Sequence, residues 1–138
     1  MFHRTLRRQM SVAFAIGVAT TVVLNLGHAL GAQLSSDPHL ALEQSVPEAD
    51  ASVGHRLEEV RLFFSQPPQL AGTSIRVVDA RDHLMEATAA EADSDDPSVV
   101  FIRLEGALAA GTYTVHWRAL AQDNHPVNGD FGFAVVTE

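Results

Sequence analysis

The sequence contains no cysteine and no lysine. Without cysteine there is no disulfide framework, no thiolate metal site and no thiol nucleophile. The chain after position 36 holds six of the nine arginines and all 17 acidic residues, which gives it a formal charge of −11. Nucleic acids and anionic membrane surfaces are bound through lysine and arginine, so this charge argues against both as partners. It suits a soluble protein that meets cations.

Motifs of the common enzyme classes are also missing. The sequence has no Gly-x-Ser-x-Gly elbow, no His-Glu-x-x-His motif and no glycine-rich phosphate loop. The acidic residues are numerous, but their spacing brings no particular pair together. We therefore predict a binding protein rather than an enzyme.

The N-terminal segment has the pattern of an export signal. Residues 1–9 contain three arginines and no acid, and Met10–Leu26 is a run without charge. A basic start, an apolar run and small residues at Ala29 or Ala32 are typical of a cleaved signal peptide. The alternative is an uncleaved anchor, because the run reaches the lower limit of the roughly 17–25 residues that span a bilayer. In both cases the rest of the chain is exported.

We divide the chain into a signal peptide (residues 1–29), a short linker (30–38) and one domain (39–138). The domain alternates short strand patterns with turn signals, which predicts an all-β Greek-key sandwich or barrel, cupredoxin- or immunoglobulin-like. About 100 residues are enough for such a domain to build its own core. The expected strands are Leu57–Phe64, Ser74–Asp79, Ser98–Leu104, Gly111–Leu120 and Asp130–Val136.

Alternation along these strands predicts which side chains form the core. The apolar faces are Val60, Leu62 and Phe64; Tyr113, Val115 and Trp117; and Phe131, Phe133 and Val135. Residues 98–104 are almost continuously apolar, so we expect that strand to be buried on both faces. Residues 65–72 contain two prolines and a glycine and predict a loop. The acidic, alanine-rich stretch 86–97 predicts a mobile connection that could include a short helix.

The stretch "AQDNHPVNGDFGF" places Asp123 and His125 two residues apart. Side chains at this spacing project to the same side of an extended or bent chain. Pro126 restricts the backbone of His125, and we expect Gly129 to let the chain turn into the final strand. The carboxylate could bind a metal directly or orient the imidazole. The alternative is an Asx-type turn with an exposed histidine.

The other histidines are weaker candidates by pattern alone. His39 opens the domain and could be a ligand or an ordinary exposed histidine. His116 faces away from Trp117, so it lies on the solvent side of the sheet or beneath a loop. We interpret His55, His83 and Met85 as surface groups.

Three segments together resemble the CopC-type copper-resistance family of periplasmic copper-binding proteins. They are "HLALEQSVPEADASV", "LEEVRLFFSQPP" and "LAAGTYTVHWRALAQDNHPVNGDFGFAV". The resemblance covers essentially all of residues 39–138. It implies a Greek-key fold related to cupredoxins, with Cu(II) bound by His39, Asp123 and His125 and by the free amine of the N-terminal histidine. Nitrogen and oxygen donors of this kind suit Cu(II).

This sequence departs from the family pattern at three points. Cleavage directly after Pro38 does not fit the small residues that signal peptidase prefers, so His39 lacks a free amine unless the chain is trimmed later. Gln66 stands where the family's Phe-Ser-Glu turn carries a carboxylate. Met85 is the only methionine after Met10, so the methionine-rich loop that binds Cu(I) in some members is absent.

The sequence therefore predicts a periplasmic protein that binds one Cu(II) ion and buffers or carries it without catalysis. The protein would be membrane-anchored if its signal is not removed. An inner-membrane copper transporter is the expected partner, and zinc is a lesser alternative for the same ligands. The competing hypothesis is an immunoglobulin-like interaction module of the cell envelope with a degenerate metal site.

Overall fold

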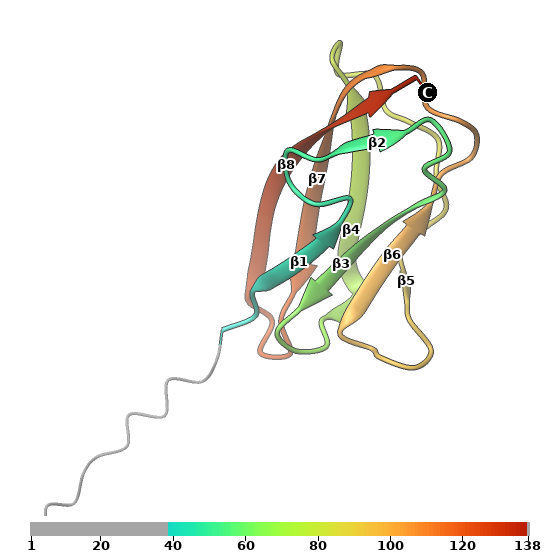
Figure 1. The fold of residues 1–138 in the computed structure, drawn as a ribbon. Helices are drawn as coiled ribbons and strands as arrows, with labels where there is room; N and C mark the ends of the chain where they lie inside the picture. The colour runs from blue at the N-terminus through green and yellow to red at the C-terminus, as the bar shows by residue number, and fades with distance from the viewer. Residues whose placement is uncertain (1–38, 138) are drawn as a thin grey trace, which may run out of the picture. The chain divides into compact units, whose positions relative to one another are not determined.

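The computed structural model describes residues 39–137, so the predicted signal peptide and linker lie outside the described residues. Eight strands form two sheets that pack face to face (Figure 1). The strands are β1 (Leu42–Val46), β2 (Ser52–Gly54), β3 (Glu59–Phe64), β4 (Gln69–Asp79), β5 (Glu91–Ala92), β6 (Val99–Arg103), β7 (Gly111–Leu120) and β8 (Pro126–Val136). Within 39–137, no helix is long and apolar enough to cross a membrane.

One sheet has the strand order β1-β3-β6-β5 and the other has the order β2-β8-β7-β4. Consecutive strands repeatedly change sheet, as at the β3–β4 and β6–β7 connections. Such crossings between two sheets are the hallmark of Greek-key sandwiches. The predicted all-β fold class is confirmed.

The core contains most of the alternating side chains that the sequence predicts, but Trp117 and Phe131 are only partly buried against it. Val60, Leu62 and Val115 are completely buried. The ring of Phe64 meets Trp117 edge-on, with the ring centroids 5.6 Å apart. Burial of each such side chain contributes on the order of 1.5–3 kcal/mol, so this cross-sheet packing provides the main stabilisation of a domain without disulfides.

Strand β6 is buried on both faces, as predicted, but by different means. One face enters the core, whereas the other is covered by two arginines that stack on Phe101. The guanidinium carbons of Arg61 and Arg103 lie 5.0 Å and 4.9 Å from the Phe101 ring centroid. Arg61 donates to Glu59 at 2.9 Å and Arg103 donates to Glu91 at 3.2 Å. Polar side chains thus cover an apolar strand face.

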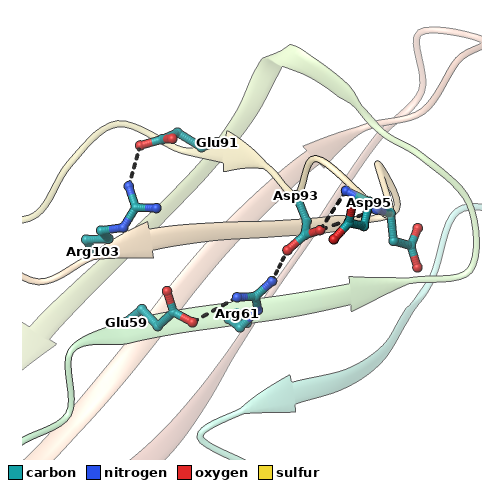
Figure 2. A network of polar contacts seen from close by, with 7 residues as sticks. Glu59, Arg61, Glu91, Asp93, Asp95 and Arg103 are labelled. Carbon is teal, nitrogen blue, oxygen red and sulfur yellow. Dashed lines mark hydrogen bonds and ion pairs between the residues drawn. The ribbon is translucent and has the colours of Figure 1, made fainter.

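The acidic stretch 86–97 contains strand β5 rather than the short helix considered above. Strand β5 pairs with the outer edge of β6. Directly after it, Asp93 contacts Arg61 and accepts hydrogen bonds from the backbone N–H groups of Asp95 and Asp96 at 2.9 Å and 3.3 Å (Figure 2). These N–H groups, that of Asp95 first, and Arg61 lower the pKa of Asp93. The open edge of β6 and this anchor outweigh the helix propensity of the alanines.

Two sequence-based boundaries were wrong. The loop predicted for 65–72 ends early, because β4 begins at Gln69 and passes an irregularity in register before Ser74. Gly129 is not a turn residue but lies inside β8, paired with Trp117. A β-carbon at this glycine would lie 2.8 Å from the Trp117 ring. The glycine is therefore required by the packing of the indole.

Candidate metal centre

Three segments meet at one end of the sandwich: the residues before β1, the β3–β4 loop and the β7–β8 loop (Figure 1, lower end). Ser65 connects the first two. Its backbone N–H donates to the Ala41 carbonyl at 2.9 Å, and its hydroxyl accepts from the Ala41 N–H at 3.0 Å. Leu40 is buried in the core. These contacts place His39, which is exposed, at this end.

The β7–β8 loop is a tight turn with internal hydrogen bonds. The Ala121 N–H donates to the His125 carbonyl at 2.9 Å, and the Asn124 N–H donates to the Ala121 carbonyl at 3.0 Å. Asn124 has a φ of 67°, a left-handed conformation that asparagine tolerates better than most residues. Asn124, five residues before Gly129, makes the reversal.

The side chains of two glutamines connect this turn to the β3–β4 loop and to the start of β4. The Gln69 side-chain amide donates to the Ala121 carbonyl at 2.7 Å and to the Asn124 Oδ1 at 2.9 Å. The Gln122 side-chain amide donates to the Pro67 carbonyl at 3.0 Å. The turn is thus held from outside as well as from within. Nothing in the sequence pattern pointed to these two residues.

Asp123 and His125 form a direct pair on this braced turn. The His125 Nδ1 lies 2.7 Å from Asp123 Oδ2, and the His125 backbone N–H donates to Oδ1 at 3.0 Å. The hydrogen bond with the imidazole, followed by that with the backbone N–H, lowers the pKa of Asp123. The second contact is the Asx-type bond considered above as an alternative. With Nδ1–H donating to the carboxylate, a neutral ring presents the lone pair of Nε2 to solvent.

A cavity of about 300 Å³ brings the predicted ligands together. His39, Asp123 and His125 line it with Gln66, and the remaining lining residues are Leu40, Ala121, Gln122 and Val127. Across residues 39–137, no three histidine or carboxylate side chains already form a metal cluster. The ligands therefore share one cavity without converging on a point. The side chain of His125 is 80% exposed, so a rotation of it or of the exposed His39 meets little packing resistance.

The other histidines lie elsewhere. His83 forms a second aspartate–histidine pair at the far end of β4, with its Nδ1 3.3 Å from Asp79 Oδ2. His55 follows β2 in a turn, and His116 lies on the outer face of its sheet opposite Asp130. None of them lines the cavity that contains His39.

Comparisons with known proteins agree with this architecture. The CopC domain family matches residues 42–136. The chain is 31% identical over 127 residues to copper resistance protein C of Escherichia coli, covering 87% of this chain and 99% of the relative. CopC from Methylosinus trichosporium OB3b superposes with a TM-score of 0.67 at 29% identity, covering 72% of this chain and 96% of that chain. PcoC, a methionine-rich copper resistance protein from Escherichia coli, gives 0.63 at 31% identity, covering 71% and 99%.

Proposed function

The chain belongs to the CopC family, and we propose that it binds Cu(II) and buffers or carries it in copper resistance. One observation supports the site above all others. Residues separated by more than 80 positions, His39 and the Asp123–His125 pair, line the same small cavity. The proposed role is binding and delivery, without catalysis.

The donor set fits Cu(II) chemically. Two imidazoles and a carboxylate are nitrogen and oxygen ligands, which suit Cu(II) in tetragonal coordination. Asp123 could ligate the ion directly or, through its bond to His125 Nδ1, orient the ring so that Nε2 binds. Zinc accepts the same donors and is the natural competitor. Cu(I) is a poor match, because Met85 is the only methionine in the domain and soft thioether ligands select that ion.

We further propose that the protein acts in the periplasm after removal of residues 1–29. The mature chain would then start upstream of His39, and the amine that the family resemblance implies would be replaced by an amide in the chain. Gln66 adds an uncharged amide at the cavity where the family pattern has a carboxylate. The amide of Gln66 lowers the negative charge of the site, and both differences lower its donor strength. We therefore expect Cu(II) affinity below that of a site with a free histidine amine. An inner-membrane copper transporter remains the proposed recipient.

The test is a Cu(II) titration of the exported protein followed by EPR, with His125→Ala and His83→Ala as matched variants. Both histidines are exposed and paired with an aspartate, but only His125 lines the cavity. We expect one tetragonal Cu(II) per chain, lost in His125→Ala and retained in His83→Ala. Equal weak binding in all three proteins would contradict the proposal and favour an interaction module with a degenerate metal site.

A further inference from the structure

A groove of about 670 Å³ runs between β1 and the middle of β8. Leu42, Trp117 and Phe131 contribute its apolar surface, and each is only partly buried. Glu43 and Glu48 line it from the β1 side, and no histidine or arginine is among its lining residues. Three partly buried apolar side chains therefore lie beside acidic groups in one groove.

The groove is bordered by two sheet edges. Strand β1 is the outer strand of its sheet, and β8 is covered by β2 only along Ala134–Val136. The Gly132 carbonyl accepts a hydrogen bond from the Asp50 N–H at 2.8 Å, and the Ala134 N–H donates to the Ala51 carbonyl at 2.9 Å. The even-numbered residues of β8 therefore direct their backbone groups away from β7, toward the groove.

Asn128 and Asp130 therefore direct their backbone N–H and C=O groups outward from the same edge. In the described part of the chain, no hydrogen bond reaches these outward groups. An edge with free donors and acceptors is a template for pairing with another strand.

We propose that this groove binds an extended segment of a partner protein in which apolar residues alternate with lysine or arginine. The segment adds to β8 as a strand and bonds with the free backbone groups of Asn128 and Asp130. Its apolar side chains pack on Trp117 and Phe131, and the alternate basic side chains lie beside Asp130 on the outer face. Glu43 on the opposite wall complements the positive charge of the segment.

Charge argues for such a partner over a second copy of this chain. Glu43, Glu48 and Asp130 form no ion pair within residues 39–137. Asp130 shares a hollow on the outer face with Arg76, His116 and Arg118, whereas the groove itself has no cationic side chain. Two copies with a formal charge of −11 after position 36 repel each other.

The groove continues from the candidate metal cavity. Val127 lines that cavity, and the next residues on the same face of β8, Gly129 and Phe131, line the groove. Side chains two residues apart on a strand are separated by about 7 Å. A bound segment consequently lies beside the metal cavity, where a protein that delivers copper to this chain or receives copper from it has to bind. The proposal itself rests on the strand edge and not on copper.

The experiment uses the copper-free exported protein and a capped Lys-Val-Lys-Val-Lys-Val peptide, with a Glu-Val repeat as the charge control. Trp117 is the only tryptophan in the chain and lines the groove, so its fluorescence reports occupancy. We expect a saturable change with the Lys-Val peptide and none with the Glu-Val peptide. Asp130→Pro removes the free N–H donor and should weaken binding by about tenfold, whereas Asp130→Ala keeps the donor and should weaken it less.

A circular dichroism melt establishes that Asp130→Pro is folded, and Asn128→Pro replaces it if it is not. Equal responses to both peptides, or no loss of affinity in the folded proline variant, would overturn the proposal. Sedimentation of the protein alone provides a further check. A dimer that Asp130→Pro converts to a monomer would identify a second copy as the occupant and would also overturn it.

Discussion

Asp123–His125 and Asp79–His83 are two aspartate–histidine pairs with similar local bonding and different surroundings. In each, one carboxylate oxygen accepts a backbone N–H from the histidine of the pair and the other lies close to its Nδ1. Asp79 ends β4, whereas Gln69, at the start of β4, braces the turn that carries Asp123. The two pairs are thus separated by roughly 30 Å along the strand.

What distinguishes the two pairs is the rest of the fold. The Asp123–His125 pair shares a cavity with His39 and Gln66. Its turn is held by the Gln69 side chain, which donates to Ala121, and by Gln122 of the turn, which donates to Pro67. The Asp79–His83 pair is stabilised by its own turn, including the Arg81 N–H, which donates to Asp79 at 2.7 Å. An aspartate–histidine pair becomes a candidate metal site when other donors are brought to it.

Among variants that keep the Asp123–His125 pair, the largest effect should come from His39→Ala. This change leaves the pair without a third ligand, as the Asp79–His83 pair already is. We expect Cu(II) affinity to fall by about 100-fold, since losing a ligand costs at least as much as losing the group that orients one. His55→Ala is the control, because His55 is outside the cavity. Isothermal titration calorimetry measures both. An unchanged affinity in His39→Ala would confine the site to the β7–β8 turn.

The next comparison replaces the carboxylates. Asp123→Asn should lower Cu(II) affinity by about 10- to 100-fold, because the amide is a weaker ligand and a poorer acceptor for His125 Nδ1–H. Asp79→Asn should leave affinity unchanged, although it alters the same kind of pair. Competition against a chelator of known affinity measures the difference. Comparable losses in both variants would mean that copper binds wherever such a pair occurs.

A smaller effect is expected from removing the glutamine side chains that hold the β7–β8 turn. Gln69→Ala removes two hydrogen bonds to the β7–β8 turn, each contributing about 0.5–1.5 kcal/mol. The free energy of unfolding should fall by about 1–3 kcal/mol and Cu(II) affinity by a few-fold. Gln122→Ala removes one such bond and should cost about half as much stability. Urea denaturation and Cu(II) titration measure the two effects. Intact affinity in a destabilised Gln69→Ala protein would show that the turn needs no external brace.

The smallest effect concerns acid stability without copper, where the two pairs should behave alike. Hydrogen bonds lower the pKa of both Asp79, mainly through the His83 N–H, and Asp123, mainly through the His125 ring. A lowered carboxyl pKa stabilises the fold above the unfolded-state pKa, and this contribution is lost as pH falls through the folded-state pKa. Urea denaturation between about pH 5 and pH 2 should therefore show that Asp79→Asn and Asp123→Asn each lose stability less steeply than the unaltered protein. A variant that loses stability more steeply than the unaltered protein as pH falls would contradict a stabilising role for that carboxylate.

Local patterns were enough to predict most of the fold. Alternation along Glu59–Phe64 and Gly111–Leu120 correctly identified the core faces, because a strand's period of two is written directly in the order of its residues. Helix propensity in 86–97 and the turn tendency of Gly129 were misleading. In each case a distant partner, the β6 edge or the Trp117 ring, determined the outcome.

The sequence by itself determined the strand pattern, the family and the spacing of Asp123 and His125, because these features depend on neighbouring residues. The family resemblance implied that His39 joins this pair, and the tertiary structure places all three residues at one cavity. Only the tertiary structure connected Gln69 to the turn and left the β8 edge open beside Trp117. Those features depend on contacts between residues far apart in the chain: Ala41 and Ser65 are 24 positions apart, and Gln69 and Ala121 are 52 apart. The packing of two sheets sets such contacts, and no local periodicity encodes them.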